Sequence, residues 1–210
     1  MHFTDAIALS SVHENGVAKL PAQSPEQRAV TGARLLAEFE KIRAFMINAI
    51  TKSCAPTGTN TPIKLPLLLE AEISYAPYCR FYEAHQRDME LSVEPLRVNL
   101  RAALAKASPQ LRKLAELDAV MDKFLRPRES QLLARVPVLL QKRFLAQYGA
   151  HLEQVAASGQ ADSPAAWMQP GGWLAGFCQH LQTLLLAEAE LRLQPSAGLL
   201  EAFNQQENHE

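Results

Sequence analysis

The sequence predicts an all-α protein built as a bundle of long, proline-kinked helices. Apolar residues recur every three or four positions through most of the chain, which places them on one face of a helix. Two pairs, Ser24-Pro25 and Ser108-Pro109, are typical of the first residues of helices. The signals that predict strands are nearly absent: there are no alternating β-branched runs, and the one Asn-Gly pair, Asn15-Gly16, is not flanked by such runs.

Capping residues and the periodicity of apolar residues predict the first two helices. Ser24 and Gln27 form the pattern of a capping box, so we expect a helix from there to about Lys52. A second helix should begin near Pro77, after a shorter segment that begins at Pro66. Its apolar stripe continues past Pro95, where the missing backbone donor should kink the helix.

The second half of the chain predicts further helices. A third helix should start at Ser108-Pro109, and Pro127 and Pro137 should divide its continuation into separate or bent pieces. A last helix is expected from Trp173 to about Leu193, closed by Pro195.

These elements suggest three parts: an N-terminal segment over 1–23, a helical bundle domain over 24–195 and a C-terminal tail over 196–210.

No signal peptide is visible, and no apolar run approaches the ~18 residues of a membrane span. The three cysteines are widely spaced and odd in number, which suits a reducing compartment. We therefore expect a cytoplasmic protein without membrane insertion.

The stripes also predict the buried core. The residues expected to be mostly buried are Leu35, Phe39, Ile42, Met89, Leu96, Leu100, Leu114, Leu117, Leu140, Phe144, Leu181 and Leu184.

Motifs for catalysis and for cofactors are missing. The chain has no Glu-x-x-His pair, no phosphate-binding loop and no nucleophile elbow, so we predict no catalytic residue, no cofactor and no metal, and hence a protein that is not an enzyme. Asp118 and Asp122 lie one helical turn apart, a spacing at which two carboxylates can share a metal, but a solvated face is the favoured interpretation. Trp167 and Trp173 flank a Pro-Gly-Gly turn, which favours a packing anchor over a binding platform.

One candidate polar cluster lies on the second helix. Tyr78, Tyr82 and His85 share a face, and Asp88 is placed to orient the imidazole. A polar pocket inside the bundle is one interpretation. The favoured one is a core stripe whose polar tips form hydrogen bonds.

Charge is distributed unevenly along the chain. Residues 97–143 carry a net charge of +7, residues 144–210 of −6 and residues 1–96 of −2. Such asymmetry can mark a surface for nucleic acid or for an acidic partner. The candidate basic face consists of Arg97, Arg101, Arg126, Arg128, Arg135, Lys142 and Arg143. Because Phe124 is the only aromatic residue in the segment and Phe144 directly follows it, we favour neutralisation by the acidic segment, mainly Glu188 and Glu190, in the chain or in a homo-oligomer.

Four stretches resemble the DUF3348 family, a bacterial family of unknown function. They are FTDAIALS at 3–10, AHQRDME at 84–90 followed by PLR at 95–97, LDAV at 117–120, and LLLAEAELRLQP at 184–195. Family members usually carry a further helical stretch before the first element, so the resemblance implies that this chain lacks one. Their genes often lie beside those of MotA/TolQ-like and OmpA/MotB-like proteins, as in Zorya-type anti-phage systems.

The leading hypothesis is a non-enzymatic helical protein that binds a partner protein. The resemblance implies a cytosolic accessory subunit of a proton-channel-linked envelope or anti-phage defence system, with products of neighbouring genes as partners. The alternative is a nucleic-acid-binding protein that uses the basic helices over 97–143.

Overall fold

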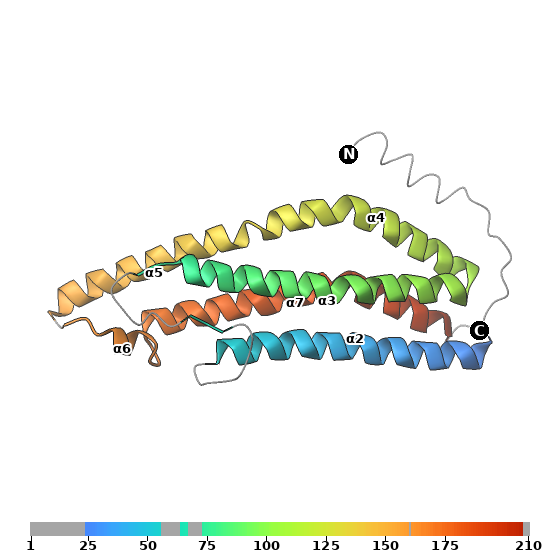
Figure 1. Ribbon diagram of the computed structural model, residues 1–210, viewed down its shortest axis with the longest axis horizontal. Helices are drawn as coiled ribbons and strands as arrows, with labels where there is room; N and C mark the ends of the chain where they lie inside the picture. The colour runs from blue at the N-terminus through green and yellow to red at the C-terminus, as the bar shows by residue number, and fades with distance from the viewer. Residues whose placement is uncertain (1–23, 56–63, 67–72, 160, 208–210) are drawn as a thin grey trace. The chain divides into compact units, whose positions relative to one another are not determined.

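The computed structural model describes residues 24–55, 64–66, 73–159 and 161–207, and confirms the all-α prediction. Helices hold 88% of these residues, and no strand occurs among them. The helices are α2 (Pro25–Cys54), α3 (Ala76–Ala107), α4 (Pro109–Leu133), α5 (Val136–Ser158), α6 (Pro164–Trp167) and α7 (Trp173–Glu207) (Figure 1). The segment predicted to begin at Pro66 falls largely on residues outside this description.

Both predicted Ser-Pro helix starts are confirmed. The backbone N–H of Gln27 donates to Ser24 Oγ at 3.3 Å, and the N–H of Ser24 donates to Gln27 Oε1 at 3.4 Å. This reciprocal pair satisfies two backbone donors at the start of α2. Ser108 Oγ accepts the N–H of Leu111 at 3.2 Å and caps α4 in the same way.

Prolines interrupt the helices less often than the sequence suggests. Pro95 and Pro127 lie inside the continuous helices α3 and α4. The expected division into separate pieces occurs before Pro137, where α4 ends at Leu133 and α5 begins at Val136. Proline in the first turn of α5 costs little, because the N–H groups there have no partner within the helix.

The prediction that Pro195 closes the last helix is wrong. Helix α7 continues through Pro195 to Glu207, so residues 196–207 of the expected tail are helical. Ser196 and Phe203 are at most 1% exposed, and Leu199 and Leu200 are also buried. Burial of this apolar face offsets the roughly 3 kcal/mol that an interior proline costs.

The described residues belong to two compact units. The first comprises Met1–Ala44, Glu90–Gln131 and Leu191–Glu210, and the second comprises Phe45–Met89 and Leu132–Glu190. The core of the first unit combines residues of α2, α3, α4 and α7. Its members include Leu35, Phe39, Leu96, Leu100, Leu104, Leu111, Ala115, Leu193 and Phe203.

The core of the second unit is rich in aromatic rings. Tyr75, directly before α3, and Tyr78 of α3 pack against Phe144 of α5 and Phe177 of α7, with ring centroids 5.4–6.3 Å apart. Phe144 also packs edge-on against Trp173 at 5.4 Å. These tilted and edge-to-face pairs stabilise the packing of three helices beyond the area that they bury.

The core prediction is largely confirmed. Eight of the twelve residues are buried: Leu35, Phe39, Met89, Leu96, Leu100, Leu140, Phe144 and Leu181. Ile42 and Leu114 are half-buried. Leu117 and Leu184 are exposed, at 37% and 39%, so their prediction is wrong. For Leu117 the reason is that α4 turns Ala115 and Asp122 inward instead of its leucine stripe.

Truncation of Leu100 tests the core of the first unit. Leu100 is fully buried, so Leu100→Ala should lower the free energy of unfolding by about 2–5 kcal/mol through lost burial and a cavity. The matched control is Leu91→Ala on the same helix, where the side chain is 69% exposed and the change should be within about 0.5 kcal/mol. Urea denaturation followed by circular dichroism measures both. Equal losses would mean that the inward face of α3 is misassigned.

Candidate interaction site

Three of the seven predicted basic residues belong to a largely buried ion-pair network in the first unit. Arg97 of α3 binds Asp118 of α4 through two hydrogen bonds of 3.0 and 2.6 Å and reaches Asp122 at 2.7 Å. Arg101, one turn later on α3, contacts Asp118 at 2.6 Å and Asp122 at 2.9 Å. These four side chains are 10–17% exposed, so little water reaches the charges.

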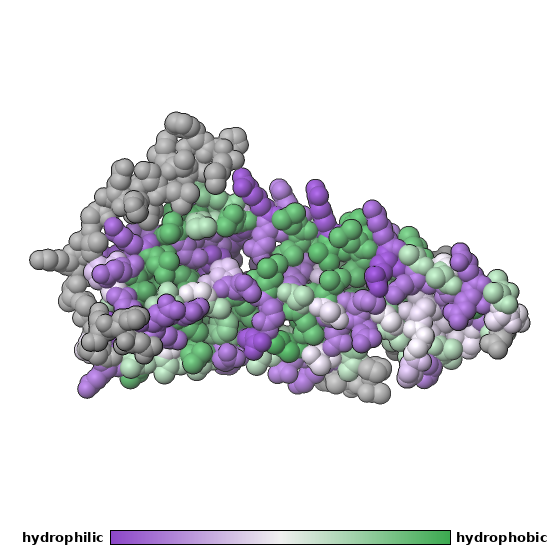
Figure 2. Space-filling model, turned by 180° about the vertical axis from the view of Figure 1, so that it is seen from behind, coloured by the Kyte–Doolittle hydropathy of each residue, from purple (hydrophilic) through white to green (hydrophobic). Residues whose placement is uncertain are grey.

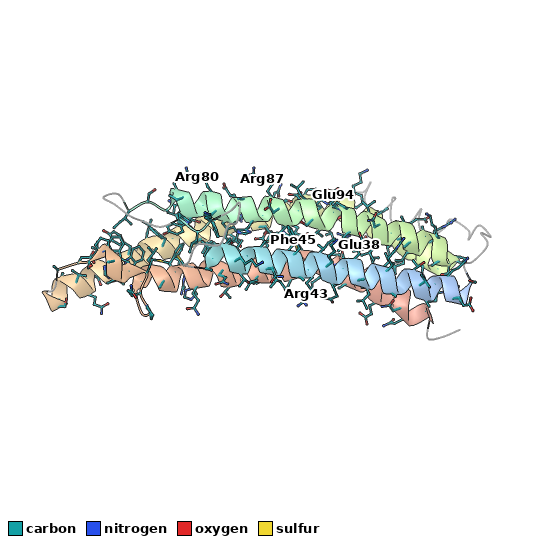
Figure 3. All side chains as sticks on the ribbon, turned by 60° about the horizontal axis from the view of Figure 1, so that its bottom comes forward. Glu38, Arg43, Phe45, Arg80, Arg87 and Glu94 are labelled. Atoms are coloured by element: carbon teal, nitrogen blue, oxygen red, sulfur yellow. The ribbon has the colours of Figure 1, made fainter. Side chains whose placement is uncertain are left out.

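Arg126 extends the network toward the surface. Its guanidinium donates to Asp122 at 2.7 Å and to Glu94 of α3 at 2.8 Å. Glu94, labelled in Figure 3, is 53% exposed. With three guanidiniums and three carboxylates, the network is neutral as a whole. The α3–α4 contact therefore includes a network of charged side chains beside its apolar residues.

The electrostatics of Asp122 follow from its surroundings. Burial raises the pKa of Asp122, but hydrogen bonds from Arg126 and Arg101 and the charge of Arg97 outweigh it, so the pKa lies below its ordinary value. The hydrogen bond to Asp122 in turn raises the pKa of Arg126. Asp122 and Arg126 are consequently charged at neutral pH.

The network shows what Asp118 and Asp122 bind and which acids neutralise the three arginines. Asp118 and Asp122 are neither a metal site nor a solvated face, because guanidiniums occupy their carboxylates. The acids that neutralise Arg97, Arg101 and Arg126 come from α3 and α4. The favoured neutralisation by Glu188 and Glu190 therefore does not apply to these three bases, and for the other bases it stays a prediction.

The other four predicted basic residues are exposed. Arg128 lies near the end of α4 in the first unit, whereas Arg135, Lys142 and Arg143 lie in the second unit. Arg143 Nη2 lies 2.9 Å from Nε2 of His180 on α7. The seven bases thus divide into a buried group of three and an exposed group, and do not form one basic face.

The candidate polar cluster contains a buried carboxylate that the sequence analysis missed. In the second unit, Tyr82 donates its hydroxyl to Glu188 at 2.9 Å. Gln86 Nε2 donates to the same carboxylate at 3.0 and 3.1 Å and to the carbonyl of Leu133 at 3.2 Å. Glu188 is only 4% exposed, so these donors replace the water that a carboxylate requires. No signal in a single sequence pairs residues 106 positions apart.

His85 of the candidate polar cluster forms its hydrogen bond with Ser53. Its Nε2 lies 2.8 Å from Ser53 Oγ, whose one hydrogen is donated to the carbonyl of Ile50 at 2.9 Å. Nε2 therefore carries the ring proton. Burial lowers the pKa of His85, although nearby Asp88 opposes this shift, so the ring is neutral at pH 7.

The remaining members of the cluster do not join Tyr82 and His85 in one pocket. Tyr78 is fully buried, and its hydroxyl has no hydrogen-bond partner among the described residues. Asp88 is exposed, as are its neighbours Arg80 and Arg87, which point away from α3 (Figure 3). The structure thus agrees with a core stripe whose polar tips mostly form hydrogen bonds.

The three thiols offer no activated nucleophile. Burial raises the pKa of Cys54 to about 11 and that of Cys178 to about 12. Burial and the neighbouring Glu83 also raise the pKa of Cys79. A nucleophilic cysteine needs the opposite shift, because the thiolate is the reactive form.

Exposed hydrophobic residues form the least expected feature of the surface. Figure 2 shows them interspersed with hydrophilic residues on one face of the molecule. On α4 of the first unit, Leu117, Met121 and Leu125 follow one another at intervals of four and are 37–48% exposed. On α5 of the second unit, Val138, Leu139, Leu145 and Leu152 are 44–60% exposed. None of the helices in the described part of the chain has the length and hydrophobicity of a membrane span.

Neutralisation of Asp122 tests the network. Asp122→Asn should lower the free energy of unfolding by about 3 kcal/mol at pH 7, because three guanidiniums lose a shared buried partner. The matched control is Glu116→Gln, which removes the same charge from an exposed position on α4 and should change stability by at most about 0.5 kcal/mol. Urea denaturation at pH 7 measures both variants.

The pH dependence gives a second test of the same residue. Because folding lowers the pKa of Asp122, its ionised form stabilises the protein above the ordinary pKa of an aspartate, about 3.9, and this stabilisation is lost as pH falls through the folded value. The stability difference between the native chain and Asp122→Asn should therefore shrink below about pH 4. A difference that stays constant down to pH 2 would contradict the charged network.

Comparison with known proteins identifies the family. The sequence model described as "Protein of unknown function (DUF3348)" matches residues 1–205. No curated protein and no solved structure matches the chain. Since the match covers almost the whole sequence, the chain belongs to the DUF3348 family.

Proposed function

We propose that the chain is a non-enzymatic interaction protein that binds a partner protein through the outer face of α5. The proposal rests on one observation: α5 is apolar on two sides. Leu140 and Phe144 are buried on its inner side, while Val138, Leu139 and Leu145 are 54–60% exposed on the outer side. Exposed apolar residues gathered on one face of a helix mark a place of contact with another molecule, so the outer side suits a partner.

Charge on this face indicates what kind of partner fits. Arg135 and Lys142 are exposed beside the apolar residues, and no carboxylate pairs with either among the described residues. The spacing of Arg135, Leu139 and Lys142, at four and three positions, places them along one side of the helix. An amphipathic helix with an acidic flank would cover the apolar residues and pair with the bases.

Nucleic acid fits the structure less well. Arg97, Arg101 and Arg126 are already neutralised, which removes three of the seven bases from a phosphate-binding surface. Phe124 of the basic segment and Phe144 directly after it cannot serve as a stacking platform, because Phe144 is fully buried and Phe124 is half-buried. Single-strand binding usually needs exposed rings between the bases.

We extend the proposal to the setting that the family resemblance implies. The partner would be a product of a neighbouring gene, within a proton-channel-linked envelope or anti-phage defence assembly, and the protein would act in the cytoplasm. The absence of activated nucleophiles and of a His, Cys or carboxylate cluster for metal among the described residues is compatible with this role.

Binding to co-expressed products of the neighbouring genes tests the proposal. The double variant Leu139→Ser, Leu145→Ser should weaken binding of the partner at least tenfold, and Lys142→Glu should weaken it through charge reversal. The control is Val30→Ser, which removes an apolar side chain that is 73% exposed on α2 and should leave binding unchanged. Isothermal titration calorimetry measures each affinity.

Two outcomes would contradict the proposal. Equal losses in the control and in the α5 variants would place the interface elsewhere. Salt-sensitive binding of single-stranded DNA or RNA, abolished by replacing Arg128, Arg135 and Lys142 with Ala, would favour the nucleic-acid alternative, because phosphate contacts release counterions.

A further inference from the structure

An open groove in the second unit is lined by both tryptophans of the chain. It lies between the C-terminal half of α5 and the segment 161–173, and its volume is about 740 Å³. Volumes of this size are typical of sites for small molecules or for a side chain of a partner. The groove is separate from the outer face of α5 proposed above, since none of Val138, Leu139 or Leu145 lines it.

The walls of the groove are held by aromatic packing and hydrogen bonds. The His151 ring stacks on Trp173 at 5.9 Å and meets Trp167 edge-on at 6.1 Å. A single oxygen of Asp162, Oδ1, accepts from Trp167 Nε1 at 2.8 Å and lies 2.9 Å from His151 Nε2. The two indoles, the imidazole and the carboxylate thus form one connected wall.

The turn before α7 allows this wall to form. Gly171 has φ of 87°, and a Cβ on Gly172 would collide with the backbone carbonyls of Ala166 and Trp167. The N–H of Gly172 donates to the carbonyl of Gln169 at 2.8 Å. Only glycine fits this close approach, which sets Trp173 beside Trp167 with ring centroids 5.6 Å apart.

The charge of the lining is one-sided. Among the described residues that line the groove there is no Lys or Arg, and Asp162 is the one acid. The hydrogen bond from Trp167 lowers the pKa of Asp162; desolvation opposes this, and the hydrogen bond from His151 adds to it. The carboxylate is therefore ionised at neutral pH, and its Oδ2 makes none of the side-chain hydrogen bonds described.

We propose that this groove binds an organic cation, a guanidinium or ammonium group, which pairs with Oδ2 of the Asp162 carboxylate beside the wall formed by Trp167, His151 and Trp173. The aromatic wall adds a further attraction for a cation that lies against it. A carboxylate supplies the matching charge and an acceptor for N–H donors. Gln154 and Ser158, which also line the groove, add neutral polar groups and no positive charge that would repel such a ligand.

Tryptophan fluorescence reports on this groove alone, because the chain has two tryptophans and both line it. The probe is arginine amide with its α-amino group acetylated, and the control is citrulline amide acetylated in the same way, which has the same shape without the charge; the two names below refer to these acetylated forms. We expect a saturable fluorescence change with arginine amide at millimolar concentrations and none with citrulline amide. Asp162→Asn should weaken the arginine amide response at least tenfold, whereas Glu153→Gln, outside the groove on α5, should leave it within about twofold.

A gain-of-affinity variant keeps the test decisive if Asp162→Asn alters the fold. Gln154→Glu adds a second carboxylate at an exposed position of the groove and should tighten arginine amide binding several-fold. Gln141→Glu adds the same charge to α5 outside the groove and should have no effect. A response that does not saturate, that citrulline amide matches, or that Gln154→Glu leaves unchanged would overturn the proposal.

Discussion

The ion-pair network between α3 and α4 is the constraint on which the first unit depends. Arg97 and Arg101 each contact both Asp118 and Asp122, so the two helices can pack in only one register without leaving a buried charge unpaired. Burying charges costs several kcal/mol per ion, and close pairing offsets that cost. The network therefore contributes less to net stability than to the choice of one helix alignment.

The same network decides which charges remain for other molecules. It uses three of the bases in the +7 segment together with Glu94, Asp118 and Asp122. Of the seven candidate bases, the four that remain exposed lie near the end of α4, directly before α5 and on α5, next to aliphatic side chains. Bases beside an apolar stripe favour a protein partner with an acidic amphipathic helix over a phosphate backbone. The proposed role thus follows from neutralisation inside the fold.

The sequence predicted local features well and contacts between helices poorly. The capping box at Ser24 needs only neighbouring residues, and the structure confirms it. Burial across Pro195 depends on packing against other helices, which periodicity does not reveal, and the helix end was therefore misplaced. Exposure of Leu117 has the same origin, because the inward face of α4 carries Asp122. The cluster around Tyr82 was found only in part, since Glu188 lies far away in sequence.

A double-mutant cycle on Arg97 and Asp118 measures the central interaction most directly. The free energies of unfolding of Arg97→Met, Asp118→Leu, the double variant and the native chain give the coupling between the two side chains. The two hydrogen bonds of 3.0 and 2.6 Å and the burial of both groups predict a favourable coupling of about 1–3 kcal/mol at pH 7. A coupling indistinguishable from zero would contradict the account, because it would mean that α3 and α4 align without this pair.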